Sequence, residues 1–165
     1  MAAFRRAVPA EHVCSLYRPS CRSGPPRAIG NHPEPDTGSV TSTSRPCPCG
    51  LPETYDACCG RFHRGAAAPT AERLMRSRYS AFARGLSDYL RDTWHPRTRP
   101  DRLDLDPGDR WTGLDVLATT GGGVFDSEGT VEFVAHRRGA PPMHEHSRFV
   151  RDGGRWAYLD GTHRR

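Results

Sequence analysis

Four cysteines, Cys47, Cys49, Cys58 and Cys59, lie within a stretch of thirteen residues. They form the pattern Cys-Pro-Cys, eight further residues and Cys-Cys, which is too dense for ordinary core cysteines. Zn²⁺ prefers thiolate ligands, and a structural zinc site usually has four ligands in a tetrahedral arrangement. Neighbouring cysteines rarely bond to each other, because such a disulfide is strained. We therefore predict that these four residues bind one zinc ion, with two disulfides or four reduced core thiols as the alternatives.

The residues around the cysteines suit a tight metal-binding loop. Pro48 stiffens the first pair, and Gly50 allows the chain to turn directly after it. Tyr55 can cover the site, and Gly60 lets the chain leave the second pair. Four sulfurs fill a tetrahedral shell, so we predict a structural zinc and not a catalytic one. His63 could compete for one position, but we interpret it as a free surface histidine because four sulfurs are available.

The charge of the chain excludes some classes of protein and weakens the case for others. The net charge is +5, and all 24 basic residues are arginine. More than half of the excess lies in residues 1–46, where six arginines face three acidic residues. A nucleic-acid-binding face is therefore compatible with the charge but not favoured. No stretch has the apolar length of a membrane helix or of a secretory signal, so we expect a cytoplasmic protein without membrane contact.

The composition changes along the chain and predicts three regions. Residues 1–45 are rich in Pro, Ser, Gly, Thr and Arg and show no periodicity, so we predict a disordered leader. Cys14 and Cys21 fall in this leader and are interpreted as spare thiols. Residues 46–65 form the predicted zinc module, and residues 66–165 the main domain.

The main domain begins with helical patterns. Thr70 is a good N-cap, and Gly85 is a natural stop for the helix between them. A second helix is predicted over about 87–93, with Ser87 as its N-cap and with Tyr89 and Leu90 facing inward.

Strand patterns follow the helices. Residues 111–119, 130–137, 146–151 and 155–159 supply apolar groups at strand spacing. Asp152-Gly153-Gly154 is a hairpin signal between the last two. Helices followed by antiparallel strands predict an α+β fold.

Several segments resemble known families. CPCGLPETYDACCG resembles the SEC-C motif, a small zinc-binding module found in the SecA translocation ATPase. LMRSRYSAF, YLRDTWHP, WTGL, VEFVAH, EHSRF and GRWAYLDGT resemble the YchJ family of bacterial proteins. This resemblance implies a SEC-C module followed by an NTF2-like (cystatin-like) domain, in which helices and a curved antiparallel sheet surround a cavity. Leu51-Pro52-Glu53-Thr54 departs from the Ser-, Gly- and Lys-rich loop of a typical SEC-C module, which reduces the basic surface that such modules offer to partners.

No catalytic set can be assigned from the sequence. The candidate acid–base residues are Asp92, His95, His144, Glu145, His146 and Asp160. His144 and His146 would share one face of a strand, and we interpret them as a solvated strand edge and not as a metal or catalytic pair. Ser77, Arg78 and Tyr79 lie in the middle of the first long helix and could face a cavity. Ion pairs that support packing are the preferred interpretation of Arg76, Arg78, Arg148, Asp88 and Asp160.

Three functions are compatible with these features. A zinc-containing adaptor that binds a protein partner is the leading hypothesis, because a closed metal module presents a rigid surface. An enzyme or small-ligand binder that uses the NTF2-like cavity is the second. A nucleic-acid binder is the third.

Overall fold

The computed structural model describes residues 45–164. The predicted leader at residues 1–45, including Cys14 and Cys21, therefore lies outside the described residues except for Arg45. The helices are α1 (Gly60–His63), α2 (Ala71–Arg84) and α3 (Ser87–Asp92). The strands β1 (Trp111–Gly121), β2 (Glu128–Arg137), β3 (Met143–Asp152) and β4 (Arg155–Arg164) follow them. This order confirms the predicted α+β class, whereas the boundary between residues 65 and 66 stays a prediction.

Helix α2 begins and ends as its capping residues predict. The Thr70 hydroxyl accepts a hydrogen bond from the Arg73 N–H at 3.1 Å. Gly85 ends the helix in the left-handed conformation, with φ +70°, which glycine adopts without strain. Leu74, Met75 and Tyr79 are buried on one face of this helix.

The other two helices differ from expectation. Helix α3 has Leu86 and not Ser87 as its N-cap, and no side chain caps it. The predicted cap is therefore wrong by one residue, although Leu90 is fully buried and Tyr89 packs against the core, as predicted. Helix α1 was not predicted, because four residues are too few to show a periodic pattern.

The four strands form one antiparallel sheet in the order β1-β2-β3-β4, so every strand pairs with its neighbour in sequence. Each strand is longer than its apolar pattern predicts. The extra residues in β1 and β4 are mostly exposed, and the extra pairs join polar or small residues such as Gly121 with Gly129 and Thr162 with His146. Backbone pairing extends these strands into exposed segments, where no alternation of apolar residues marks a strand in the sequence.

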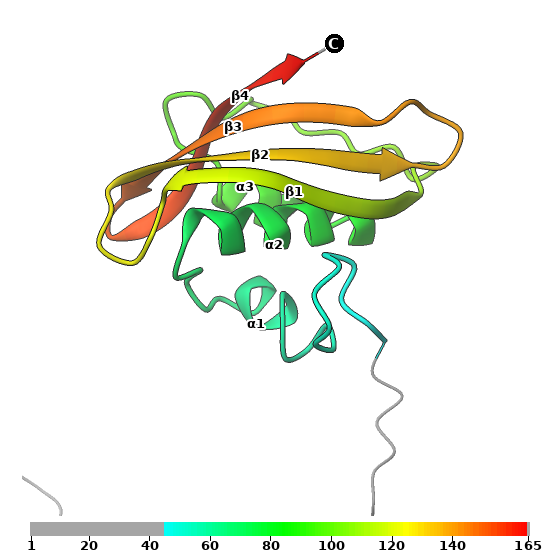
Figure 1. The fold of residues 1–165 in the computed structure, drawn as a ribbon, viewed down its shortest axis with the longest axis horizontal. Helices are drawn as coiled ribbons and strands as arrows, with labels where there is room; N and C mark the ends of the chain where they lie inside the picture. The colour runs from blue at the N-terminus through cyan, green and yellow to red at the C-terminus, as the bar shows by residue number, and fades with distance from the viewer. Residues whose placement is uncertain (1–44, 165) are drawn as a thin grey trace, which may run out of the picture. The chain divides into compact units, whose positions relative to one another are not determined.

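Helix α2 lies between the curved sheet and α1 (Figure 1). The main core fills the space around α2 and includes Phe62, Leu74, Val131, Phe149 and Trp156. Phe62 comes from α1, so the segment after the cysteines shares this core with the sheet. No helix within residues 45–164 is both long enough and apolar enough to cross a membrane.

Candidate metal centre and ligand pocket

The four clustered cysteines converge on one point. Their sulfur atoms all lie within 4.8 Å of one another. The side chains are 0–4% exposed and form a separate buried cluster that Leu51 and Tyr55 cover. The predicted covering role of Tyr55 is therefore observed.

Backbone hydrogen bonds fold the loop that carries the cysteines. The Cys47 N–H donates to the Glu53 carbonyl at 3.1 Å, and the Gly50 N–H donates to the Cys47 carbonyl at 3.2 Å. Gly50 has φ +82°, as the predicted turn requires. A Cβ at Gly60 would lie 2.8 Å from the Tyr55 carbonyl oxygen, so only glycine fits where the chain leaves Cys59.

The sulfur spacing fits a metal ion. Zn–S bonds of about 2.3 Å in a tetrahedron place the sulfurs roughly 3.8 Å apart. Cys49 and Cys58 have their sulfurs 3.6 Å apart, and those of Cys58 and Cys59 are 3.9 Å apart. All four thiols are free, so the disulfide alternative does not apply. The cluster can hold a metal ion, and the assignment of these residues as zinc ligands stays a prediction.

The ionisation of the thiols shows why a cation suits this cluster. Hydrogen bonds from Cys49 and Cys59 lower the pKa of the Cys47 thiol. The same hydrogen bond to Cys47 raises the pKa of Cys49 to about 12, and burial adds to this effect. Ionisation of one buried thiol therefore opposes ionisation of the next, and a bound cation would allow all four to ionise together.

His63 lies in a hydrogen-bond network and is not free on the surface, so that interpretation is wrong. Its Nε2 donates to the Ser77 carbonyl at 2.9 Å, which leaves Nδ1 to accept from the Tyr55 hydroxyl at 2.7 Å. The Ser77 hydroxyl donates to the Leu74 carbonyl and accepts from the Tyr89 hydroxyl at 2.6 Å. Buried polar groups thus connect the cysteine loop with all three helices.

A second candidate site lies on the opposite side of α2. A pocket of about 250 Å³ opens between α2 and the sheet. Its walls are mostly aromatic or apolar, including Met75, Tyr79, Phe82, Trp94, Trp111, Phe133 and Phe149. Its polar lining residues are Arg78, Glu145, Tyr158 and His163. An apolar pocket with a few convergent polar groups is the usual form of a small-molecule site.

Two ionisable side chains of the pocket are deeply buried. Arg78 is 5% exposed, and its Nη1 donates to the Leu90 carbonyl and the Thr93 hydroxyl, both at 2.7 Å. Glu145 is 8% exposed, and its Oε1 accepts from the Ser147 hydroxyl at 2.6 Å and the Tyr158 hydroxyl at 3.1 Å.

The comparison with protein families matches this fold. The model of the YchJ middle NTF2-like domain matches residues 70–161. This chain belongs to the YchJ family. A UPF0225 protein of Streptomyces coelicolor is 63% identical over 117 residues, which cover 70% of this chain and 94% of that protein. A UPF0225 protein of Corynebacterium glutamicum is 54% identical, with the same two coverages.

Two solved structures are similar to this YchJ-family chain. A SEC-C motif containing protein from Rhodopseudomonas palustris is 39% identical, with a TM-score of 0.59, and the match covers 70% of this chain and 96% of that protein. A sec-c motif containing protein from Psychrobacter arcticus is 31% identical, with a TM-score of 0.60, and the match covers 72% of this chain and 82% of that protein. The NTF2-like fold and the resemblance to SEC-C proteins are therefore confirmed.

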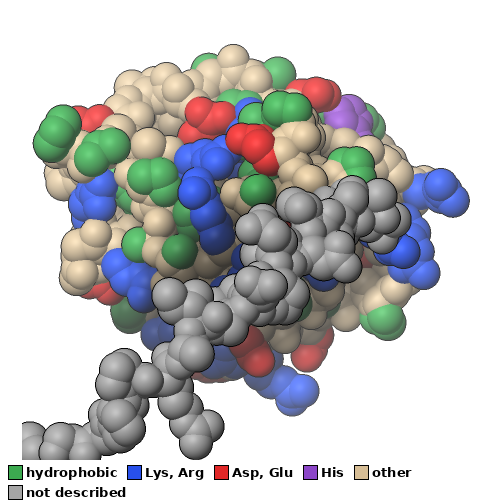
Figure 2. Space-filling model, turned by 90° about the horizontal axis from the view of Figure 1, so that it is seen from below, with side chains coloured by type: hydrophobic (Ala, Val, Ile, Leu, Met, Phe, Trp, Pro, Cys, Tyr) green, Lys and Arg blue, Asp and Glu red, His purple; other side chains and the backbone are tan. Residues whose placement is uncertain are grey.

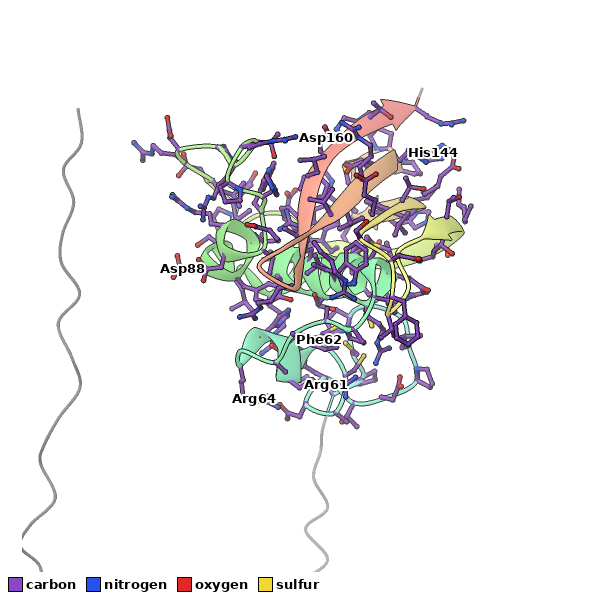
Figure 3. All side chains as sticks on the ribbon, turned by 90° about the vertical axis from the view of Figure 1, so that its left-hand side faces the viewer. Arg61, Phe62, Arg64, Asp88, His144 and Asp160 are labelled. Atoms are coloured by element: carbon purple, nitrogen blue, oxygen red, sulfur yellow. The ribbon has the colours of Figure 1, made fainter. Side chains whose placement is uncertain are left out.

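Most of the predicted acid–base candidates do not meet in the pocket between α2 and the sheet. Among them only Glu145 lines it. His144 bonds to Glu132 at 2.8 Å, and Asp160 pairs with Arg148 at 2.7 Å, both on the sheet. Figure 3 shows His144 and Asp160 on the sheet, far from Arg61 and Phe62 of α1.

Of the other three candidates, His146 lies in β3 opposite Thr162, Asp92 is the last residue of α3, and His95 follows that helix. Asp92 lines a separate open groove of about 630 Å³, in which Asp88 also lies. His95 lies beyond α3, and its backbone N–H donates to the Tyr158 carbonyl at 2.8 Å.

The interpretation of the arginines as ion-pair partners holds for some and fails for one. Arg148 pairs with Asp160, and Arg76 pairs with Glu72 at 2.8 Å. Arg78 has no carboxylate partner within the described residues, so the predicted ion pair is wrong there. Arg78 and Tyr79 do line the pocket, whereas Ser77 points to the network of His63. The sequence signal for Arg78 was an arginine on the apolar face of a helix, four residues after Leu74.

Proposed function

We propose that this YchJ-family protein binds a small molecule in the pocket between α2 and the sheet. The buried guanidinium of Arg78, enclosed by aromatic walls and without a carboxylate partner in residues 45–164, supports this proposal most strongly. Burying a charge without an ion-pair partner is costly, and such groups concentrate at functional sites.

The four cysteines are assigned to one structural zinc ion. A tetrahedral set of four sulfurs suits zinc or iron–sulfur chemistry, and a closed shell without an open position suits a structural role. The similarity to SEC-C motif proteins agrees with this assignment. Elemental analysis of natively purified protein should find about one zinc per chain.

The zinc module would brace α2 from the side opposite the pocket. The Cys47 sulfur lies 3.6 Å from the Ser80 hydroxyl, and Arg76 Nη1 donates to the Cys49 carbonyl at 3.0 Å. Met75, Arg78, Tyr79 and Phe82 line the pocket from the same helix. The metal site and the pocket therefore share one structural element.

Ligand-observed NMR with a set of small aromatic compounds, neutral and charged, tests the proposed pocket. Ala135 lines the pocket and is 1% exposed, so Ala135→Leu should fill it and abolish binding. Ala118→Leu places the same side chain at an exposed position of β1 and should leave binding intact. If no compound shows binding that depends on Ala135, the proposal is rejected.

A protein-docking role has separate support. Phe125 is fully exposed and Val124 is 60% exposed, both in the loop between β1 and β2. Arg151 holds this loop by donating to the Val124 and Asp126 carbonyls at 2.8 and 2.9 Å. An exposed aromatic side chain on a fixed loop is typical of an interface anchor.

The predicted adaptor role and its protein partner remain a proposal that pull-down can test. The baits are the wild type, Phe125→Ser, Cys58→Ser and, as a control for apolar exposure, Leu117→Ser, because Leu117 is 55% exposed. A partner that binds the loop should be lost only with Phe125→Ser, and a partner that binds the cysteine module only with Cys58→Ser. Identical partner sets from all four baits would exclude both surfaces as docking sites.

The charge distribution supports nucleic-acid binding least. In the view of Figure 2, basic and acidic side chains are interspersed on the visible face and form no continuous basic stripe. Phosphate backbones are typically bound by such stripes.

A further inference from the structure

Arg78 has hydrogen-bond donors that the protein does not use. A guanidinium carries five N–H groups. The Nη1 group makes both of its hydrogen bonds, to the Leu90 carbonyl and the Thr93 hydroxyl. Within residues 45–164, neither Nε nor Nη2 of Arg78 has an acceptor. These two nitrogens form one edge of the guanidinium, and such an edge binds a carboxylate through two parallel hydrogen bonds.

Two aromatic rings lie close to the same guanidinium. The Trp94 and Tyr158 rings lie 5.1 and 4.6 Å from the guanidinium carbon. These cation–π contacts partly compensate the charge, but they supply no hydrogen-bond acceptor in the plane of the guanidinium. The unused edge can therefore be satisfied only by a group that lies in that plane.

The other buried charge of the pocket does not fill this position. No carboxylate oxygen of the described residues lies within 4.0 Å of Arg78, whereas Arg76 and Arg148 both have such a partner. Glu145 directs Oε1 to Ser147 and Tyr158, and its Oε2 lies 3.8 Å from His163 Nδ1. Glu145 thus acts on Arg78 only from a distance.

A second unused donor belongs to Trp94, a residue that lines both this pocket and the groove beside α3. The indole Nε1 of Trp94 is buried and has no hydrogen-bond partner among the described residues. Trp156, by comparison, donates its Nε1 to the Pro69 carbonyl at 3.2 Å. Buried donors without acceptors are rare in native proteins, because each loses its hydrogen bonds to water without replacement.

We infer that the ligand of this pocket is a small, flat monocarboxylate, with its carboxylate on the free Nε–Nη2 edge of Arg78 and its apolar body against the aromatic walls. This inference rests on the proposed ligand-binding function. One cation beside the negative Glu145 favours a single negative charge over a phosphate dianion. The pocket volume of about 250 Å³ lies below the usual range of pockets for drug-sized ligands, and it limits the apolar body of the ligand to about one ring.

Benzoate and benzamide test the charge of the ligand, because they share one shape and differ in the anion. Titration of the full-length, metal-loaded protein can be followed by tryptophan fluorescence, since Trp94 and Trp111 line the pocket. Benzoate should bind at least about tenfold more tightly than benzamide, as expected for a charged hydrogen-bonded pair. Inorganic phosphate should not displace it at equal concentration.

Arg78→Gln should remove the preference for benzoate, and Arg148→Gln, which changes an exposed arginine on the sheet, should keep it. The comparison of the two probes on the wild type remains decisive even if Arg78→Gln does not fold. Three results would overturn the inference but leave the pocket as a ligand site. Benzamide could bind as tightly as benzoate, the preference for benzoate could survive in Arg78→Gln, or phosphate could displace benzoate. If neither these probes nor the neutral aromatic compounds bind in a way that depends on Ala135, the inference and the proposed function fail together.

Discussion

Arg78 keeps its positive charge although its side chain is buried. Burial lowers the pKa of Arg78 to about 10, which still leaves the guanidinium protonated near neutral pH. The hydrogen bonds to Leu90 and Thr93 and the cation–π contacts with Trp94 and Tyr158 replace part of its lost hydration. A permanent cation in an aromatic pocket does not need a change of pH to attract an anion.

His63 illustrates the opposite response to burial. Burial lowers the pKa of His63 below its usual 6.5, and the nearby Arg84 and Arg64 act in the same direction. The hydrogen bond to the Ser77 carbonyl and the charge of Cys47 oppose this shift but do not outweigh it. The folded protein therefore holds His63 neutral at a pH where the unfolded chain would bind a proton.

His63 should make the folded state sensitive to mild acid. As the pH falls below 6.5, the unfolded chain takes up a proton that the folded state resists, so the free energy of unfolding decreases. When the pH is lowered from about 8 to about 5.5, the melting temperature should fall further for the wild type than for His63→Gln. Both proteins have the same cysteines, so acid release of metal affects both and the difference reports His63. Parallel pH profiles would contradict this assignment.

Among the elements, the β1–β2 hairpin is tied to the start of α2. The Ala71 N–H donates to the Gly122 carbonyl at 2.9 Å, and the Gly122 N–H donates to the Glu128 carbonyl at 3.0 Å. A Cβ at Gly122 would lie 2.6 Å from the Ala71 Cβ. A Cβ at Gly129 would collide with the backbone of Gly122. This contact fixes the start of α2 against the β1–β2 hairpin.

Gly129→Ala should destabilise the protein by about 2–3 kcal/mol, because backbone atoms cannot move aside as a flexible side chain can. Thermal or urea unfolding measures the loss. The control is Gly113→Ala, also in the sheet, where the nearest atom would lie 3.5 Å away, on His136, in ordinary contact. A loss no larger than that of the control would show that the hairpin can shift without cost.

For the whole molecule, metal binding and ligand binding should be coupled through α2. Removing the metal proposed at the four cysteines with a chelator, or substituting one proposed metal-binding residue by Cys58→Ser, should lower the melting temperature and weaken benzoate binding together. The physical reason is that the cysteine loop packs on Ser80 and Arg76, one helical turn or less from Arg78 and Tyr79 of the pocket.

Metal content, melting temperature and benzoate affinity of the same samples check this coupling. Cys14→Ser is the control, because Cys14 lies outside the four-cysteine cluster. A metal-free protein that melts and binds benzoate like the wild type would show that the module is dispensable for both.

The sequence by itself determined the features that local chemistry encodes. The spacing of Cys47, Cys49, Cys58 and Cys59 predicted their convergence, because the intervening loop is short and Gly50 and Gly60 allow its turns. Thr70 and Gly85 set the bounds of α2 through caps that act within one helical turn. The alternation of apolar residues placed the centres of all four strands and three of their ends, at Trp111, Arg137 and Arg155, whereas backbone pairing extends the other five ends.

Only the tertiary structure decided which polar groups meet. Arg78 and Glu145 are far apart in sequence, and no spacing rule relates a helix to the strand that covers it. The folded chain places Arg78 beside Trp94 and Tyr158 and turns His144 and Asp160 to other neighbours. A side chain's burial and its unused donors depend on the packing of distant elements, and therefore they become visible only once those elements are assembled.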